Sequence, residues 1–343
     1  MVRGFTAEMT PYVSVVMAVC NGEKYLSDAV ESILSQSFRE FEFIIIDDGS
    51  TDATASILAQ FEKRDARVLI HRFDTNHGLS SALNFAIQHA RGEYIARMDA
   101  DDISFPNRLS GQVAYLDEHP EVGICGTWVE LIGDSAGKTW KHPLSHEAIS
   151  VRMLFANALV HSSVMLRRSV MTRHELYYDE SIRYAQDYEL WSRAMLVTRF
   201  ANVGSILLQY RVYKTSSGVQ NLEQQDQTKA IVQRRILSLL GVECTGEELD
   251  LHNQLSIFRY GNDEEFFHRA RTWLEKLLLA NARTHVFSPR LLSKDLGVRW
   301  TQICERVELP FTKLIRNILS SPLPFYYLRW LIKRSRLDKL ILR

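Results

Sequence analysis

The chain has 343 residues, of which 46% are hydrophobic and 24% are charged, as is typical of soluble globular proteins. This composition excludes wholesale disorder, and the four scattered cysteines exclude a disulfide scaffold or a CxxC zinc site. The formal net charge is zero, but it is unevenly distributed. Residues 311–343 hold eight basic residues and one acid, whereas residues 1–310 hold 33 basic and 40 acidic residues. Such segregation is typical of a nucleic-acid or membrane surface.

Three features of the sequence predict a cytoplasmic protein. Free and widely spaced thiols suit a reducing compartment. No apolar run reaches the ~18 residues that a membrane span needs. The apolar stretch over residues 13–20 is too short and wrongly flanked for a signal peptide, and a buried strand explains it better.

The first hundred residues alternate between short apolar runs and longer amphipathic stretches. The apolar runs over residues 13–19 and 41–46 predict buried strands, and two further strands are expected over 67–71 and 94–98. The stretches between them have helical spacing, and we expect Asn21 to cap the first helix and Ser50 or Thr51 the second. A third helix is expected over 79–90. This alternation indicates βαβ units and a mainly parallel sheet flanked by helices.

The pattern changes in the second half of the chain. A helix from Pro106 to Glu118 is followed by predicted strands over 122–132 and 159–166. A further helix is expected to begin near residue 186, and a last strand is expected over about 203–212. Residues 215–218 have the composition of a linker, and the patterns beyond them are helical without a strand signal. We therefore expect an α/β domain over residues 1–215 and an α-helical C-terminal region over 216–343.

Two acidic clusters follow predicted strands directly. Asp47 and Asp48 end the second strand, and Asp99, Asp101 and Asp102 follow the fourth. Ligands of open α/β sheets bind beyond the carboxyl ends of the strands. Closely spaced carboxylates there can bind Mg²⁺ or Mn²⁺ and so neutralise a diphosphate, and a single carboxylate can accept hydrogen bonds from a base or ribose. The alternative for Asp47 and Asp48 is turn chemistry that leads to a helix cap, and the alternative for the second cluster is a solvated acidic turn.

Asp187 lies where a helix is expected to begin. The helix dipole and the free N–H groups there would keep its carboxylate ionised, and an ionised carboxylate beside a cleft can act as a general base. The alternative is a first-turn acid that only stabilises the helix. His161 is a weaker candidate for an acceptor or phosphate contact, and Lys24, Arg97 and Arg167 are weaker candidates for diphosphate contacts. Their default interpretations are a structural histidine and solvated surface charges.

Taken together, these segments resemble the inverting family 2 glycosyltransferases, which have the GT-A fold. The matching pieces occur in the family's order over about residues 12–215 and comprise 13–17 with Asn21-Gly22, 34–38, 43–52, 76–78, 92–102, 106–109, 161–165 and 187–191. Each piece alone is common, but their order and spacing together are specific. The resemblance implies a GT-A catalytic domain over 1–215, a nucleotide-sugar donor and a divalent metal, Mn²⁺ or Mg²⁺.

The resemblance also implies roles for single residues. Asp48 would bind the uracil-like base, Asp99 would lie near the ribose and metal, and Asp101 would be a direct metal ligand. Asp187 would deprotonate the acceptor hydroxyl, which attacks the anomeric carbon in line with inversion as the nucleoside diphosphate leaves. Further donor-binding residues would be Val19, Asn21 and Ala100, and weaker candidates are Asp47, Lys24, Asn76, Gly78, Asp102, His161, Arg211 and Tyr213.

The chain departs from the family pattern at three positions. Cys20 stands where an aromatic residue usually precedes the Asn, which removes one expected stacking contact with the base. Gln186 stands where an acid usually precedes the catalytic Asp. Tyr213 stands where a histidine often follows the Tyr-Arg pair. If that histidine helps to bind metal or diphosphate in the family, another group must do so in this chain.

The basic C-terminal tail, residues 311–343, predicts a membrane contact. Residues 323–342 mix aromatic and aliphatic side chains with clustered Lys and Arg, and a basic helix of this kind lies well in an anionic membrane interface. One alternative is a helix packed on the catalytic domain with its basic face in water. The other is a nucleic-acid contact, which would show steep salt dependence.

We therefore predict an inverting glycosyltransferase that moves a sugar from a nucleotide-diphosphate donor, with a UDP-sugar expected, to a hydroxyl of a glycan acceptor. The tail favours a lipid-linked surface-polysaccharide intermediate as acceptor and a peripheral position on the inner face of the plasma membrane, with no nucleic-acid partner. Two alternatives stay open. One is a nucleotidyltransferase, although residues 18–24 make only a thin phosphate loop, and the other is a non-catalytic glycan-assembly scaffold with a degenerate donor site.

Overall fold

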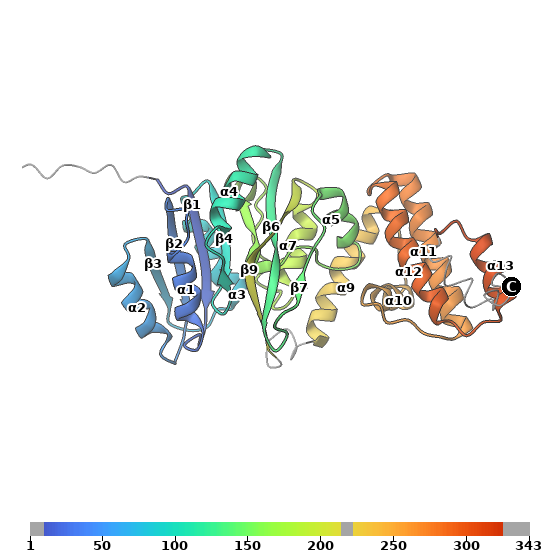
Figure 1. Ribbon diagram of the computed structural model, residues 1–343, viewed down its shortest axis with the longest axis horizontal. Coiled ribbons are helices and arrows are strands. Elements are labelled where there is room, and N and C mark those ends of the chain that lie inside the picture. Colours follow the sequence, from blue (N-terminus) through green and yellow to red (C-terminus); the bar gives the residue numbers. More distant parts are fainter. Residues whose placement is uncertain (1–9, 214–221, 325–343) are drawn as a thin grey trace, which may run out of the picture. The chain divides into compact units, whose positions relative to one another are not determined.

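The structure is a computed structural model that describes residues 10–213 and 222–324 (Figure 1). The chain divides into two compact units. Unit 1 is Met1–Ile149 with Asn157–Lys229, and unit 2 is Ser150–Ala156 with Ala230–Arg343. The division expected at residue 215 lies in the undescribed segment 214–221 and stays a prediction. The assignment of 150–156 to unit 2 was not expected from the sequence.

Unit 1 is built on one nine-stranded sheet with the order β3-β2-β1-β4-β8-β6-β9-β5, in which β7 also pairs with β6. Its first four strands are parallel and alternate with helices: β1 (Val13–Val19), α1 (Leu26–Leu34), β2 (Phe41–Asp48), α2 (Thr54–Arg64), β3 (Val68–Phe73), α3 (Leu79–His89) and β4 (Tyr94–Asp99). Ala18 pairs with both Ile46 and Asp99, so β1, β2 and β4 end at the same edge of the sheet. The α/β sheet flanked by helices that the sequence predicts is confirmed.

The rest of the sheet is mixed, because β8 pairs antiparallel with both β4 and β6, and β5 pairs antiparallel with β9. The elements that follow β4 in the chain are β5 (Ile103–Ser104), α4 (Arg108–Glu118), β6 (Val122–Gly133), β7 (Thr139–Trp140), α5 (His146–Met153), β8 (Met165–Arg167), α6 (Arg168–Arg173), α7 (Gln186–Ala194) and β9 (Arg199–Val212). The strand expected over 159–166 is wrong, because His161–Ser163 form a 3-10 turn and only β8 is extended. The Ser163 hydroxyl donates to the Val160 carbonyl at 2.8 Å, a local bond that competes with extended backbone.

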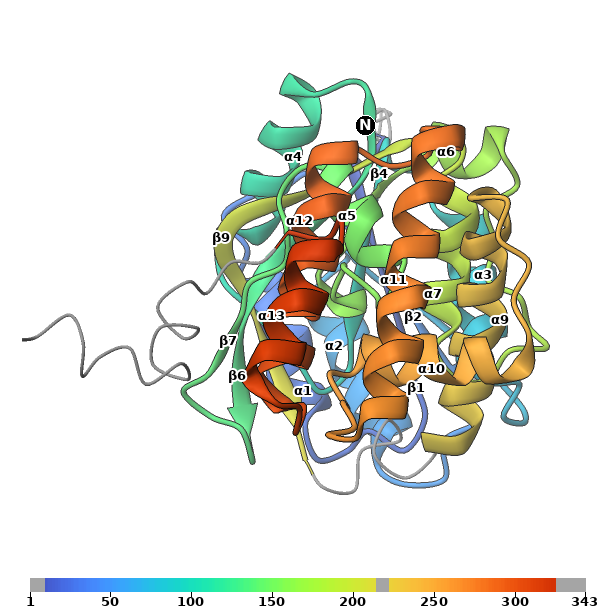
Figure 2. The same ribbon diagram turned by 90° about the vertical axis from the view of Figure 1, so that its right-hand side faces the viewer.

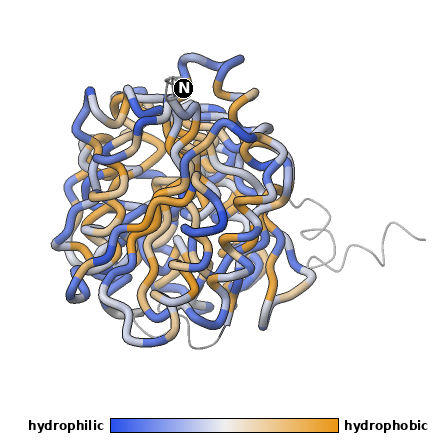
Figure 3. The backbone as a smooth tube through the Cα atoms, turned by 90° about the vertical axis from the view of Figure 1, so that its left-hand side faces the viewer, coloured by the Kyte–Doolittle hydropathy of each residue, from blue (hydrophilic) through white to orange (hydrophobic). Residues whose placement is uncertain are grey.

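The core of unit 1 explains why the parallel strands form where they do. Alternate side chains of a strand face opposite sides of the sheet, and Val13, Val15 and Met17 of β1 pack in one cluster with α1, α2 and α4. Helix α3 packs against β1 and β2 from the other side. Figure 3 shows hydrophobic stretches of the tube in the middle of this unit and hydrophilic stretches toward its outside. Each large apolar side chain buried here contributes about 1.5–3 kcal/mol, which holds the strand ends in place.

Unit 2 is helical in its described part. Helix α9 (Leu222–Leu239) leads into it, followed by α10 (Gly246–Ser256), α11 (Glu264–Thr284), α12 (Pro289–Arg306) and α13 (Phe311–Ser320). Helices α11 and α12 lie side by side (Figures 1 and 2), with Trp273 and Trp300 buried. The Trp273 indole donates to His252 Nδ1 at 3.1 Å, and His252 Nε2 is bonded to the Leu154 carbonyl at 2.8 Å. The latter bond ties the 150–156 segment to this unit.

None of the helices in the described residues has the length and apolarity needed to span a bilayer. Most of the basic tail, residues 325–343, lies outside the described residues. The predicted membrane contact of the tail therefore stays a prediction.

Candidate active site

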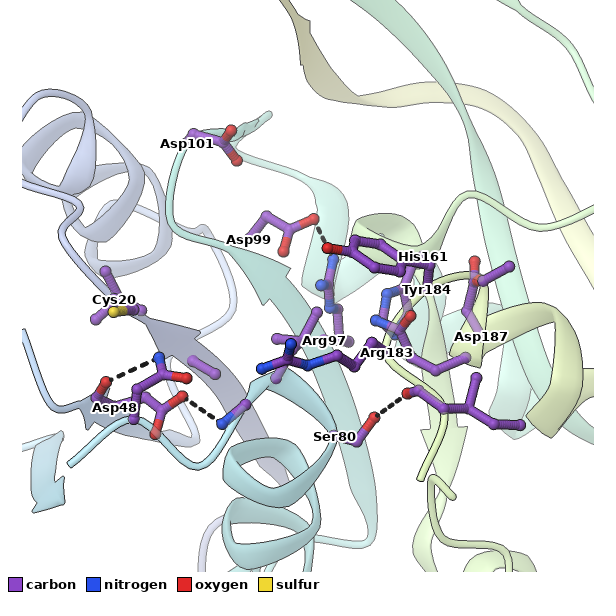
Figure 4. A pocket seen from close by; sticks show the side chains of 18 of the residues that line it. Cys20, Asp48, Ser80, Arg97, Asp99, Asp101, His161, Arg183, Tyr184 and Asp187 are labelled. Atoms are coloured by element: carbon purple, nitrogen blue, oxygen red, sulfur yellow. Dashed lines mark hydrogen bonds and ion pairs between the residues drawn. The ribbon is translucent and has the colours of Figure 1, made fainter. Parts of the chain in front are cut away.

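A pocket of about 610 Å³ opens at the edge of the sheet where β1, β2 and β4 end. Its walls also include the start of α3, the loop before α7 and the end of β9, and five of its lining residues are Asp48, Asp99, Asp101, Asp102 and Asp187. Figure 4 shows Cys20 and Asp48 on one side of the pocket and Asp187 on the other, with Arg97 and Asp99 between them. The two acidic clusters and the candidate base, far apart in sequence, thus share one pocket.

Three carboxylates at the end of β4 and just after it line this pocket. Oxygen atoms of Asp99, Asp101 and Asp102 lie within 4.8 Å of one another. Burial and the charge of Asp99 raise the pKa of Asp101 to about 6, and burial with both neighbouring charges raises the pKa of Asp102 well above its ordinary value. Three like charges so close together disfavour one another, and a bound cation would relieve this repulsion.

A second observation also supports a divalent-cation site at this cluster. Oδ2 of Asp102 is buried and makes no hydrogen bond of normal geometry among the described residues, although the Ser162 side chain lies close enough to lower the pKa of Asp102, whereas buried polar atoms are normally paired. Carboxylate oxygens are the ligands that Mg²⁺ and Mn²⁺ prefer. Asp102, a weaker candidate from the sequence, is therefore as well placed in this cluster as Asp99 and Asp101.

The end of β9 holds the acidic cluster in place. The Arg211 backbone N–H donates to Asp102 Oδ1 at 2.7 Å, and Arg211 Nε donates to the Asp101 carbonyl at 2.7 Å. The Tyr213 hydroxyl donates to Asp101 Oδ2 at 3.1 Å. Burial and the charge of Asp101 raise the pKa of Tyr213 to about 12, so this hydroxyl keeps its proton. Tyr213, which replaces the family's histidine, thus donates to the cluster.

Asp48 shapes the other side of the pocket. Its Oδ1 accepts from the His77 N–H at 2.7 Å and its Oδ2 from the Gly78 N–H at 2.9 Å, while Asn76 Nδ2 donates to its carbonyl at 3.3 Å. Each carboxylate oxygen keeps further acceptor capacity for a ligand. Gly49, at a φ of +71°, lets the two loops touch, since a Cβ there would lie 2.6 Å from the Thr75 backbone.

Asp187 is the second residue of α7, as the sequence predicts. The Tyr188 N–H donates to its Oδ1 at 2.8 Å, and Asn157 Nδ2 donates to its Oδ2 at 2.6 Å. Burial raises the pKa of Asp187, although these bonds and the charge of Arg97 oppose the rise. The N–H at the helix start thus favours the ionised form as expected, but burial is the larger effect. A raised pKa makes a carboxylate a better proton acceptor near neutral pH.

Arg97 is buried in β4 and is not the solvated surface charge that was its default interpretation. Its guanidinium forms an ion pair with Asp99. His161 lies in the 3-10 turn and is bonded through Nε2 to the Tyr178 hydroxyl at 2.7 Å. Burial and the charge of Arg97 hold the pKa of His161 well below its usual value, so His161 is neutral.

Five sequence candidates do not line the pocket: Asn21, Lys24, Asp47, Ala100 and Arg167. Asn21 does not cap α1 but accepts from the Thr51 N–H at 2.9 Å, which joins the loops after β1 and β2. Asp47 accepts from the Ser50 N–H at 3.0 Å, which is turn chemistry. The caps expected at Ser50 or Thr51 are wrong too, because α2 begins at Thr54 without a side-chain cap at its preceding residue. Lys24 is exposed over the Tyr25 ring, and Ala100 packs on the core.

The remaining sequence candidates line the pocket, together with residues that the sequence did not indicate. Val19, Asn76, Gly78, His161, Arg211 and Tyr213 belong to the lining, and so do the unanticipated Ser80, Glu180, Arg183, Tyr184 and Tyr210. Residues 180–185 form a loop without sequence periodicity. Their proximity to the pocket follows from long-range packing, such as the bond from Asn84 Nδ2 to Glu180 at 3.0 Å.

The chain is similar to known proteins of one family. The model of glycosyl transferase family 2 matches residues 14–174. An uncharacterised glycosyltransferase of Haemophilus influenzae is 33% identical over 250 residues, which cover 69% of this chain and 77% of the relative. The O-antigen biosynthesis glycosyltransferase WbnJ of Escherichia coli is 33% identical over 211 residues, which cover 60% of this chain and 81% of the relative.

Solved structures show the same fold. TarS 1-349 of S. aureus in complex with UDP-GlcNAc superposes with a TM-score of 0.58 at 18% identity, over 85% of this chain and 90% of that one. The mannosyltransferase PcManGT of Pyrobaculum calidifontis, in complex with GDP-Man and Mn²⁺, gives a TM-score of 0.51 at 17% identity, over 98% of this chain and 87% of that one. The chain therefore belongs to glycosyl transferase family 2, and it is a glycosyltransferase with the GT-A fold.

Proposed function

We propose that this enzyme transfers a sugar with inversion from a UDP-sugar to a hydroxyl of a glycan acceptor. The observation that carries the proposal is the single pocket that contains both the Asp99–Asp102 cluster and Asp187. An inverting transfer needs a base on the acceptor side and charge stabilisation on the leaving-group side. Figure 4 places Asp187 and Asp48 on opposite sides of Asp99, which suits this division of roles.

The residues divide accordingly. Asp48 and the 76–78 loop would hold the nucleotide, and Asp99, Asp101 and Asp102 would hold Mn²⁺ or Mg²⁺. When bound, the cation would stabilise the negative charge of the departing diphosphate. Asp187 would accept the proton of the acceptor hydroxyl. Cys20 lines the nucleotide side of the pocket and is exposed, so the base would lack an aromatic stacking partner at this position.

The donor is tested by a metal-dependent binding screen across UDP-, dTDP- and GDP-sugars, followed by identification of the product. We expect calorimetry to show binding of UDP-sugars only with Mn²⁺ or Mg²⁺ present, and turnover to release free UDP. Release of pyrophosphate would instead indicate nucleotidyl transfer. Absence of any metal-dependent nucleotide binding would indicate a scaffold with a dead donor site.

We propose that the acceptor is a lipid-linked polysaccharide intermediate, and that the basic tail meets an anionic membrane where this acceptor lies. The relative WbnJ, named for O-antigen biosynthesis, supports the polysaccharide part of this proposal.

We expect the enzyme to bind vesicles that contain phosphatidylglycerol but not pure phosphatidylcholine vesicles. Replacing Arg329, Lys333, Arg334 and Arg336 by Gln should weaken binding by on the order of a thousandfold, since four basic residues at ~1 kcal/mol each contribute about 4 kcal/mol together. Unchanged binding would contradict the proposal, as would a preference for RNA or DNA.

A further inference from the structure

Asn157 contacts the candidate base from a part of the chain that no motif covers. It lies in the loop after α5, and its side chain is partly buried. Its Nδ2 donates to Asp187 Oδ2 at 2.6 Å, and its Oδ1 accepts from the Leu159 N–H at 3.1 Å. The second bond sets the orientation of the amide. A flipped amide would put its NH₂ group against an N–H and its carbonyl against a carboxylate, and both contacts are repulsive.

The bond from Asn157 leaves Asp187 held but still able to act. Among the described residues, Asn157 Nδ2 donates to Oδ2 and the Tyr188 N–H donates to Oδ1. Each oxygen keeps further acceptor capacity for a proton of an acceptor. Ala185, two residues before Asp187, has a φ of +53°, which non-glycine residues rarely adopt and which tends to mark functional positions. The bonds from Asn157 and from the Tyr188 N–H together fix the plane of the Asp187 carboxylate.

We propose that Asn157 is the positioning residue of the catalytic base: its amide orients the Asp187 carboxylate toward the acceptor and favours the ionised form. This inference rests on the proposed role of Asp187 as the base. A hydrogen bond to a charged group favours that charged form over the neutral one, and such bonds are stronger than bonds between neutral groups. Without Asn157, the buried carboxylate would keep its proton to a higher pH.

Other charged or titratable groups also face Asp187 and stay in place when Asn157 is changed. Arg97 on β4 favours the ionised form of Asp187, and Tyr178, whose hydroxyl bonds His161, lies within electrostatic reach of it. On α7 itself, Glu189 is engaged with Arg193. Since these groups are common to all variants, a difference in the titration of Asp187 between the wild type and an Asn157 variant measures the effect of the Asn157 amide.

The test uses Asn157→Leu, which removes the donor at similar size, and Asn157→Asp, which keeps the shape and the bond from Leu159 but replaces the donor by a carboxyl group. The ionisation of Asp187 is followed by ¹³C NMR of labelled aspartate carboxyls, with the Asp187 signal assigned from its loss in Asp187→Asn. We expect its titration to move to higher pH in Asn157→Leu and further in Asn157→Asp, because a neighbouring carboxylate disfavours ionisation.

The rate of UDP release from a UDP-sugar gives the second readout. Because the base must be ionised to act, activity rises with pH as Asp187 loses its proton, and the rise should occur at higher pH in both variants. On the acidic side, kcat of Asn157→Leu should be on the order of tenfold lower than that of the wild type, since a bond to a charged group is worth about that factor. On the alkaline side the two rates should approach each other, and KM for the donor should stay unchanged.

Two results would overturn the proposal. One is an Asp187 titration that does not move in either variant. The other is a loss of activity that is equal at all pH values, which indicates a structural role only. If Asp187→Asn retained full activity, the role of Asp187 itself would be wrong, and this outcome is separate because the NMR titration does not depend on turnover.

Discussion

Replacing Asp187 by Asn is expected to lower the rate of sugar transfer by roughly 10³-fold, within the range that a positioned general base contributes. The amide has the same shape as the carboxyl group but cannot take the proton of the acceptor hydroxyl. Its oxygen can still accept a hydrogen bond from the Tyr188 N–H, so α7 should keep its start. Nucleotide binding should change little, because Asp48 and the acidic cluster are untouched.

The measurement is kcat for transfer or for donor hydrolysis, together with the Kd of UDP in the presence of Mn²⁺. Asp28→Asn is a matched control, since it makes the same carboxyl-to-amide change in the first turn of a helix, α1, at an exposed residue outside the pocket. We expect the control to stay within a few-fold of wild type, on the scale of ordinary surface substitutions. Wild-type turnover in Asp187→Asn would show that another group is the base.

Replacing Asp101 by Asn is expected to weaken metal-dependent UDP binding by at least about a hundredfold, since even outer-shell partners of a metal contribute 10–100-fold to its affinity. The substitution removes one of the three charges that would hold the cation, while the amide oxygen can still accept from the Tyr213 hydroxyl. The protein without metal should be as stable as the wild type or more stable, because repulsion among the three carboxylates is reduced.

Calorimetry of UDP binding with and without Mn²⁺, and thermal unfolding without metal, measure both effects. A lower affinity combined with an unchanged or higher Tm distinguishes loss of a cation site from loss of folding. Tyr213→Phe serves as a comparison, because it removes the hydroxyl bonded to Asp101 but leaves all three carboxylates. Equally tight UDP binding with and without metal in the wild type would contradict a cation site at these residues.

The first half of the fold could be predicted because its central strands are buried on both sides. Buried parallel strands appear as mainly apolar runs, as β1, β2 and β4 do, whereas β3 at the end of the sheet is only partly buried. The stretch 159–166 is also largely apolar, yet only Met165–Arg167 is strand. There, local bonds of Ser163 and the 3-10 turn at His161 decide the backbone, and apolar periodicity does not reveal such bonds.

The positions of the acidic groups could be predicted from the rule that strand ends form the ligand edge of an α/β sheet. This rule places Asp48 and the cluster after β4 without any knowledge of packing. Arg97 had a local signal, because a charged side chain inside the apolar run 94–98 must find a partner when buried. Asn157 had no such signal. Its contact with Asp187 joins a loop to the start of α7, 30 residues away in sequence, and only the folded chain brings them together.

The stereochemistry of donor hydrolysis tests the role of the pocket most directly. When water replaces the acceptor, proton NMR can follow which anomer of the free sugar appears first from an α-linked UDP-sugar. If Asp187 activates the attacking group in line with the departing UDP, the β-anomer forms first and equilibrates later, and Asp187→Asn suppresses its formation. First appearance of the α-anomer, at a rate that does not depend on Asp187, would contradict an inverting site with Asp187 as its base.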